Sequence, residues 1–392
     1  MGIGYSGLHL TGGQMPEILK QHRVFSGGDR HYTIVKAFLP GNHCWIPVKG
    51  NMEEVIQAYE QVGETVVIFA SGDPYFFGFG NTLKRLRPEA KVRSFPYFNC
   101  IQLLSHQVQF NYSEISIVSV HGRSWDKLDE ALVAGSHSIG VLTDQQKSPA
   151  AVAKRLLEYG FTHYRMILGE ELESPDQQIN TLSLHEAAVY ESKVVNCLIL
   201  EKTGTLGNIG FGIKDDRFAS LPGRPGMITK RPVRLTTIST LELGDANVFW
   251  DVGSCTGSIA IEAKRLFPAL KTIAFEKRTE CESIIRQNMR KFQCPGVQLE
   301  IGDVFEMDLE ALPKPDTLFI GGHGNRLAEM IRLMDQYLRP GGRMLMNTVK
   351  EDSANIFFEV CRQLGYQAEP PVAITVDTHN QIKVLSACKA EI

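Results

Sequence analysis

The chain has 392 residues, of which 43% are apolar and 22% are charged. This composition is that of a folded protein, and the length exceeds what one hydrophobic core usually holds. A net charge of −3 argues against a general nucleic-acid binder, which normally carries a basic stripe. We therefore expect two or three globular domains and no nucleic-acid partner.

Apolar residues and cysteines are both widely dispersed. No apolar run approaches the roughly 20 residues of a membrane-spanning helix, and the first residues lack the regions of a signal peptide. The eight cysteines are scattered and form no C-x-x-C pair. We expect no membrane segment, no metal site and no disulfide framework, and a location in the reducing cytoplasm.

The first half alternates apolar runs with amphipathic stretches, which predicts α/β structure with mainly parallel sheets. Strands are predicted at 66–70, 115–120, 139–143, 164–168 and 194–200, and helices at 51–62 and 150–159. Glycine and proline then become frequent between about 203 and 230, which is typical of a connector. We therefore predict domains at 1–203 and 226–392, joined by a linker at 204–225.

The second half has a more regular doubly wound pattern. Strands are predicted at 248–252, 272–275, 297–301, 317–320, 344–349, 372–376 and 382–387. Helices are predicted at 258–267 and near 327–338, and on another helix Ile285, Met289 and Phe292 share one face. The last two strands flank Asp-Thr-His-Asn-Gln and predict a closing hairpin, which is typical of methyltransferase sheets and unusual in dehydrogenase sheets.

The segment Asp-Val-Gly-Ser-Cys-Thr-Gly, residues 251–257, joins a predicted strand to a predicted helix. Such a turn lets a ligand lie against bare backbone, and the helix start offers free N–H donors. Glu276 and Asp303 follow at the ends of the next two strands, on the edge where open α/β sheets bind ligands. One carboxylate can accept from both ribose hydroxyls and the other from an adenine amino group, which predicts an S-adenosylmethionine pocket.

A dinucleotide site is disfavoured at this turn. The G-x-G-x-x-G fingerprint would need glycine at Cys255 and Ser258. A Cβ at Cys255 crowds the place where a pyrophosphate approaches the backbone, whereas S-adenosylmethionine has no phosphate.

Three segments together resemble known enzymes of cobalamin (vitamin B12) synthesis. Ser-Gly-Asp-Pro-Tyr-Phe-Phe-Gly, residues 71–78, resembles the signature of the tetrapyrrole (class III) methyltransferases. Residues 118–123, Val-Ser-Val-His-Gly-Arg, resemble the segment that marks their precorrin-6Y branch. Residues 226–234, ahead of the 251–257 turn, resemble the opening of a class I precorrin methyltransferase and decarboxylase. The order of the halves is similar to that of the fused precorrin-6Y C5,15-methyltransferases (decarboxylating).

This resemblance implies a tetrapyrrole-methyltransferase fold of two small α/β subdomains, followed by a Rossmann-like class I sheet with an antiparallel terminal strand. It implies two S-adenosylmethionine sites and a precorrin-type substrate. The first half would methylate carbon 5, and the second would methylate carbon 15 and decarboxylate the acetate of ring C. Both parent families tend to self-associate, so we expect a homo-oligomer.

The resemblance also implies site residues. The implied cofactor contacts are Thr229, Gly253, Ser254, Cys255, Thr256, Gly257 and Glu276 in the second half and Gly72, Asp73 and Pro74 in the first. The chain departs from the family at Cys255, where glycine is usual. It also departs at Met1, because a full apolar strand usually precedes Gly2-Ile3-Gly4.

Methyl transfer from a sulfonium to an electron-rich ring carbon depends mainly on holding donor and acceptor in line, so we expect no catalytic dyad. A substrate with many carboxylates calls for cationic partners. The candidates are Lys230, Arg231, Arg234 and Arg123. His323, in Gly-Gly-His-Gly after the fourth strand, is the candidate for moving a proton during catalysis.

Two other functions fit parts of the sequence. One is a class I methyltransferase of RNA or another small molecule with an unrelated N-terminal domain, although the negative net charge disfavours RNA. The other is a corrinoid-binding or scaffolding protein in which the altered Ser254-Cys255 loop holds no cofactor.

Overall fold

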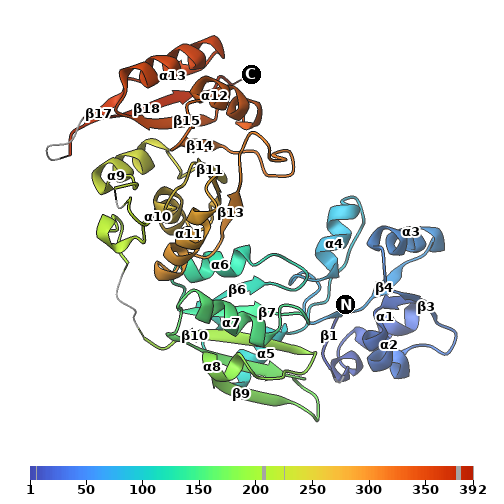
Figure 1. The fold of residues 1–392 in the computed structure, drawn as a ribbon. Coiled ribbons are helices and arrows are strands. Elements are labelled where there is room, and N and C mark those ends of the chain that lie inside the picture. Colours follow the sequence, from blue (N-terminus) through green and yellow to red (C-terminus); the bar gives the residue numbers. More distant parts are fainter. Residues whose placement is uncertain (6, 205–208, 225, 377–380, 392) are drawn as a thin grey trace. The chain divides into compact units, whose positions relative to one another are not determined.

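The computed structural model describes residues 1–5, 7–204, 209–224, 226–376 and 381–391 (Figure 1). The chain folds into two compact units. The first unit comprises residues 1–123, 137–154 and 164–203, and the second comprises 124–136, 155–163 and 204–392. In the part of the chain that the structure describes, none of the helices has both the length and the apolar character to cross a membrane.

The first unit opens with two small parallel sheets, one of three strands and one of two. Strand β2 (Val24–Gly27) pairs with β3 (Cys44–Pro47) and β4 (Val66–Ile68), and β1 (Gly2–Ile3) pairs with β5 (Ala70–Ser71). Their core includes the buried side chains of Leu10, Leu19, Phe25, Val35 and Phe69. The helices are α1 (Met15–Gln21), α2 (Asp29–Val35), α3 (Met52–Val62) and α4 (Phe79–Leu86), with 3₁₀ turns at Leu8–Thr11 and Lys36–Phe38.

A five-stranded sheet follows, with the order β6-β7-β10-β8-β9. Its strands are β6 (Ile115–Ser119), β7 (Ser138–Leu142), β8 (Tyr164–Glu170), β9 (Gln178–Ser183) and β10 (Asn196–Lys202). Only β6 and β7 pair in parallel, so the prediction of mainly parallel sheets is wrong for this sheet. The short connection between β8 and β9 joins antiparallel neighbours, since a parallel pair needs a long crossover. In the first unit this sheet is accompanied by α5 (Cys100–Gln107) and α8 (Leu184–Ala187), with a 3₁₀ turn at Tyr112–Glu114. Helix α6 (Asp126–Val133) falls in the second unit, and α7 (Pro149–Glu158) is divided between the two.

The second unit is built on an eight-stranded sheet, with the path β13-β12-β11-β14-β15-β18-β16 and β17 paired to β18. The strands are β11 (Val248–Val252), β12 (Lys271–Glu276), β13 (Val297–Ile301), β14 (Thr317–Ile320), β15 (Arg343–Thr348), β16 (Gln367–Ala368), β17 (Val372–Ile374) and β18 (Ile382–Cys388). Strands β11 to β15 are parallel, and β18 runs antiparallel to β15, β16 and β17. The hairpin residues 377–380 lie outside the described residues.

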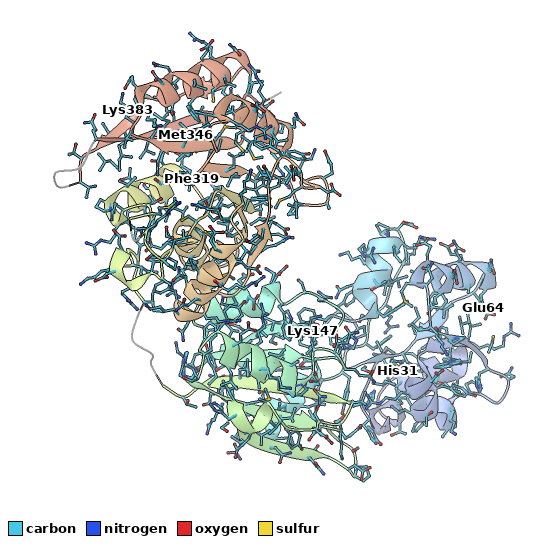
Figure 2. The ribbon with its side chains drawn as sticks, viewed as in Figure 1. His31, Glu64, Lys147, Phe319, Met346 and Lys383 are labelled. Atoms are coloured by element: carbon cyan, nitrogen blue, oxygen red, sulfur yellow. The ribbon has the colours of Figure 1, made fainter. Side chains whose placement is uncertain are left out.

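Helices cover both faces of this sheet, so its central strands are apolar on both sides (Figure 1). Trp250 packs in a cluster with residues of α12 and α13, whereas its neighbour Phe249 packs with residues of α9 and α10. Phe319 and Met346, on β14 and β15, likewise pack in different clusters (Figure 2). The helices are α9 (Arg231–Thr240), α10 (Ser258–Leu266), α11 (Glu280–Lys291), α12 (Leu327–Tyr337) and α13 (Glu351–Gln363), with a 3₁₀ turn at Asp215–Arg217.

The described part of the predicted linker packs as part of the second unit. Ile213, Phe218 and Leu221 are buried in a cluster with residues of α10 and α11. The backbone N–H of Ile213 donates to Glu262 Oε1 at 2.6 Å. This segment is therefore fixed to the sheet's helical layer, while the domain boundaries stay a prediction.

Candidate functional site

A cavity of about 540 Å³ lies at the carboxyl edge of the second unit's parallel strands. It is lined by residues that follow β11, β14 and β15 and by the segment that leads into α9. These include Met227, Thr229, Lys230, Asp251, Gly253, Ser254, Cys255, Thr256, Arg278, Gly322 and Asn347. The edge is the one where open α/β sheets bind ligands, as the sequence predicts.

The turn after β11 can form only with glycine at 253. Gly253 has a φ of +82°, a left-handed conformation that side chains disfavour. A Cβ at this position would lie 2.5 Å from the Gly322 nitrogen, so the loops after β11 and β14 approach backbone to backbone. Cys255 also has a positive φ, +53°, and thus adopts a conformation better suited to glycine.

Two polar groups in this cavity are suited to bind a ligand. Thr256 is 1% exposed, and among the described residues its hydroxyl has no hydrogen-bond partner. Asp251 is buried, and one carboxylate oxygen accepts from the Ala260 N–H at 3.2 Å. Burial raises the pKa of Asp251 to about 7. An orphaned donor and a carboxyl that a neighbouring cation would ionise fit a ligand with hydroxyl and ammonium groups, as in S-adenosylmethionine.

Glu276 lies beneath the turn, at the end of β12. Its carboxylate is buried and accepts from the Cys255 N–H at 2.7 Å. It also forms an ion pair with Arg278, whose Nε lies 3.0 Å from Oε1. Arg278 lines the cavity, and Glu276 does not.

Asp303 follows β13 but does not line the cavity. Its carboxylate accepts from Lys277 at 2.7 Å and from the Phe305 N–H at 3.2 Å. The hydrogen bond from Lys277 lowers the pKa of Asp303. The role of Asp303 toward adenine stays a prediction. Gly257 precedes α10 and does not line the cavity, so its contact with the cofactor also stays a prediction.

The three predicted cations at the start of α9, Lys230, Arg231 and Arg234, lie in three different environments. Lys230 lines the cavity, whereas Arg231 is exposed and is not a lining residue. Arg234 is fully buried, and its guanidinium donates to Glu262 at 2.5 Å, to Asp215 at 2.9 Å and to backbone carbonyls. The prediction that Arg234 binds substrate is therefore wrong, because it faces the core, where Glu262 neutralises it.

His323 lies next to Gly321 and Gly322, which line the cavity, but is not itself a lining residue. Within the described chain its buried Nδ1 has no hydrogen-bond partner. Burial, with a smaller contribution from Lys350, lowers the pKa of His323, which therefore favours the neutral imidazole. A neutral ring can accept or relay a proton.

A second cavity, of about 420 Å³, lies within the first unit. Its lining comes from short pieces of many loops and strand ends, including Tyr5, Arg30, His31, Ser71, Gly72, Asn99, His121, Arg123, Glu171, Glu173 and Asn196. Of the predicted residues, Gly72 and Arg123 are in this lining. Gly72 has a φ of +61°, and a Cβ there would lie 2.9 Å from the Phe98 carbonyl oxygen.

The other two predicted residues of the first unit do not line this cavity. Asp73 caps its own turn by accepting from the Tyr75 N–H at 2.8 Å. Pro74 is buried and lines a different cavity, next to α4. Their part in cofactor binding stays a prediction.

Sequence reasoning missed two polar pairs at the first unit's cavity, whose lining includes His31, Ser71 and Glu173. His31, on α2 (Figure 2), accepts from the Gly28 N–H through Nδ1, so Nε2 carries the proton that it donates to Ser71 at 2.9 Å. Burial lowers the pKa of His31 to about 4. Tyr97 donates to Glu173 at 2.5 Å. These partners lie 40 and 76 residues apart, so no local pattern indicates them.

Comparison with known proteins agrees with this two-unit arrangement. Residues 16–188 match the tetrapyrrole (corrin/porphyrin) methylases, and residues 223–378 match the precorrin methyltransferase domain. A precorrin-6Y C(5,15)-methyltransferase [decarboxylating] of Sinorhizobium sp is 29% identical over 93% of this chain and 87% of its own length.

Two shorter relatives of Salmonella typhimurium match one half each. A cobalt-precorrin-6B C(15)-methyltransferase (decarboxylating) is 33% identical over 36% of this chain and 71% of its own length. A cobalt-precorrin-7 C(5)-methyltransferase is 28% identical over 50% of this chain and 95% of its own length. The chain therefore belongs to the precorrin-6Y C5,15-methyltransferases (decarboxylating), S-adenosylmethionine-dependent enzymes of cobalamin biosynthesis that fuse the two domains.

Proposed function

We propose that the two units divide the family's reaction between them. The first unit methylates carbon 5 of the precorrin, and the second methylates carbon 15 and decarboxylates the ring C acetate. The separate C(5) and C(15) relatives of the two halves support this division. The observation that carries it is that each unit has its own cavity, with the Gly253 turn in one and the Gly72 turn in the other.

In the second unit, the turn from Gly253 to Thr256 holds the cofactor against bare backbone. Glu276 accepts from the ribose hydroxyls, Asp303 from the adenine amino group, and Thr229 contacts the ligand from the other wall. Asp251 and the Thr256 hydroxyl face the polar groups of the methionine part. This assignment rests on the lining of the cavity and on the orphaned Thr256 hydroxyl.

In the first unit, the turn at Gly72, Asp73 and Pro74 holds the second cofactor, and Gly72 contributes backbone to the cavity. Arg123 and, in the second unit, Lys230 bind substrate carboxylates, because both are cations in the lining. Arg231 is exposed beside Lys230 and extends this charge.

The reactions of the two units differ in the number of protons that they release. When bound, S-adenosylmethionine supplies an electrophilic methyl group. Each methylation replaces a ring hydrogen and releases one proton, while decarboxylation of an acetate leaves a carbon that takes up one proton. Protons therefore balance within the second unit, where His323 relays them, and one proton must leave the first unit.

The test is to incubate the full chain with precorrin-6Y and cofactor and to follow product mass. Two added methyl groups with loss of carbon dioxide are expected. Thr256→Val removes only the orphaned hydroxyl and should slow methylation at carbon 15 about tenfold, a loss typical of one hydrogen bond, with carbon 5 unchanged. Equal slowing at both carbons would refute the division.

The variant His323→Ala tests the role of His323 separately from that of the cofactor turn. We expect slower decarboxylation and an altered pH profile, with unchanged affinity for S-adenosylhomocysteine. Unchanged turnover in both steps would remove His323 from the mechanism.

We also propose domains at 1–203 and 226–392, a reducing cytoplasmic location and a homo-oligomer. All eight cysteines are free thiols, which supports the location. Both parent families tend to self-associate, which supports the oligomer. Sedimentation equilibrium of the full chain tests it, and a monomer across the concentration range would contradict it.

A further inference from the structure

The carboxylate of Glu276 is fully engaged by groups of the protein itself. Oε2 accepts from the Cys255 N–H at 2.7 Å and from Arg278 Nη2 at 3.3 Å. Oε1 accepts from the Arg278 N–H at 2.9 Å and from Arg278 Nε at 3.0 Å. A carboxylate offers about four acceptor positions, and all four are used.

Two of these four donors belong to the backbone and two to a side chain. The Cys255 and Arg278 N–H groups are fixed by the turn and by the end of β12, so they remain with the carboxylate. The guanidinium of Arg278 can leave, because its side chain is 31% exposed and reaches into the cavity. Its other contacts are weak, because they are with sulfur atoms: Nη1 lies 3.8 Å from Met227 Sδ, and the guanidinium also interacts with the Cys255 thiol.

We propose that Arg278 is an internal ligand of Glu276 that the ribose of the cofactor must displace. This inference rests on the proposed role of Glu276. The two ribose hydroxyls would occupy as many acceptor positions as the guanidinium does, so ribose and guanidinium cannot bind the carboxylate together. Cofactor binding in the second unit is thus an exchange of partners, and Arg278 sets its affinity.

The exchange predicts the direction in which removal of Arg278 changes the affinity for the cofactor. In the ligand-free protein, the guanidinium stabilises a carboxylate whose side chain is only 2% exposed. Removing the guanidinium leaves that buried charge with two donors instead of four, which destabilises the ligand-free state. The ligand-bound state loses less stability, because the ribose supplies the missing donors. Affinity for a ribose-bearing ligand therefore rises when Arg278 is removed.

The experiment compares Arg278→Met with Arg224→Met in the full chain. Arg224 is the matched control because its guanidinium also contacts Met227 Sδ, at 3.9 Å, yet is exposed and does not touch Glu276. Calorimetric titration with S-adenosylhomocysteine measures binding to both cavities. Because Glu276 lies in the second unit, the binding event that Glu276→Gln weakens is assigned to that unit. For that event we expect a Kd about tenfold lower in Arg278→Met and unchanged in Arg224→Met.

The possible outcomes separate the two hypotheses. If Glu276→Gln leaves every Kd unchanged, the proposed role of Glu276 fails. If Glu276→Gln weakens binding but Arg278→Met leaves it equal or weaker, Arg278 is not a competitor and this inference fails alone. In the double variant the gain from Arg278→Met should disappear, because the carboxylate for which the two compete is gone.

A second measurement is made on the unaltered protein and uses a conservative variant only to assign one signal. In ¹⁵N-arginine-labelled protein, the Nε–H signal of Arg278, assigned by its loss in Arg278→Lys, should be protected in the ligand-free state. Adding S-adenosylhomocysteine should shift it and speed its exchange with water. A signal that stays protected and unshifted at saturation would overturn the proposal.

Discussion

The two candidate cofactor cavities of this chain are built in different ways. In the second unit, five residues of the short run from Asp251 to Thr256, at the end of β11 and just after it, line the cavity. In the first unit, a cavity of similar size is assembled from short pieces spread between Ile3 and Cys197. The second unit keeps buried carboxylates at its site, whereas the first presents aromatic rings, glycines and a neutral His31.

This difference shows how a site depends on its scaffold. A turn between a strand and a helix is held by the hydrogen bonds of both elements, so its geometry follows from its own sequence. A cavity between loops depends on each loop packing correctly, and a change in any one of them alters the ligand's environment. The second unit's site should therefore tolerate distant substitutions better than the first unit's site.

The largest effect should come from Arg234→Met, which tests whether the two units unfold separately. It leaves Glu262, a buried carboxylate, without its partner, which costs about 3–5 kcal/mol in comparable buried pairs. In calorimetric unfolding we expect the transition of the second unit to move to lower temperature while that of the first stays. Arg231→Met, an exposed neighbour, should change stability by less than about 0.5 kcal/mol. If the unfolding temperatures of both units fell together, the two units would not unfold separately and the prediction would be wrong.

A smaller, selective effect is expected from Gly72→Ala. The positive φ and the close approach of Phe98 should cost about 1–3 kcal/mol and narrow the first cavity. Methylation at carbon 5 should fall while methylation at carbon 15 and decarboxylation continue, as product mass would show. Gly63→Ala is the control, because Gly63 also has a positive φ but no neighbour within 4 Å of an added Cβ. If both variants slow carbon 5 methylation equally, strain alone accounts for the effect.

The smallest expected effect is the pH dependence of cofactor binding in the second unit. Burial raises the pKa of Asp251 to about 7, above its value in an unfolded chain. The protonated carboxyl therefore stabilises the ligand-free fold at low pH, and this contribution is lost as pH rises through about 7. The cationic cofactor prefers the carboxylate, so its affinity should rise about tenfold between pH 6 and 8. Asp251→Asn should make that affinity independent of pH, and titrations across this range measure it.

The sequence predicted the parts of the fold and the site that depend on local pattern. Strands β11, β13 and β14 have the predicted bounds, and four of the five residues from Gly253 to Gly257 line the cavity. Apolar runs and glycine turns are local features, so they can be read directly.

What could not be predicted depends on partners far apart in the chain. Arg234 looks like a surface cation because nothing near it shows that Glu262, 28 residues on, meets it in the core. Arg278 gives no signal of a site, since an arginine after a strand is usually solvated. The antiparallel insertion of β10 between β7 and β8 likewise follows from tertiary pairing, which alternating apolar runs do not encode.

Strand β18 has a consequence for synthesis on the ribosome. It follows β15, β16 and β17 in the chain, yet it is the strand with which all three pair. Until Ile382–Cys388 has emerged, the outer part of the second unit's sheet has no partner and its edge stays open. The first unit contains every strand that its own sheets need by Lys202, so it can complete its folding while the second is still being translated.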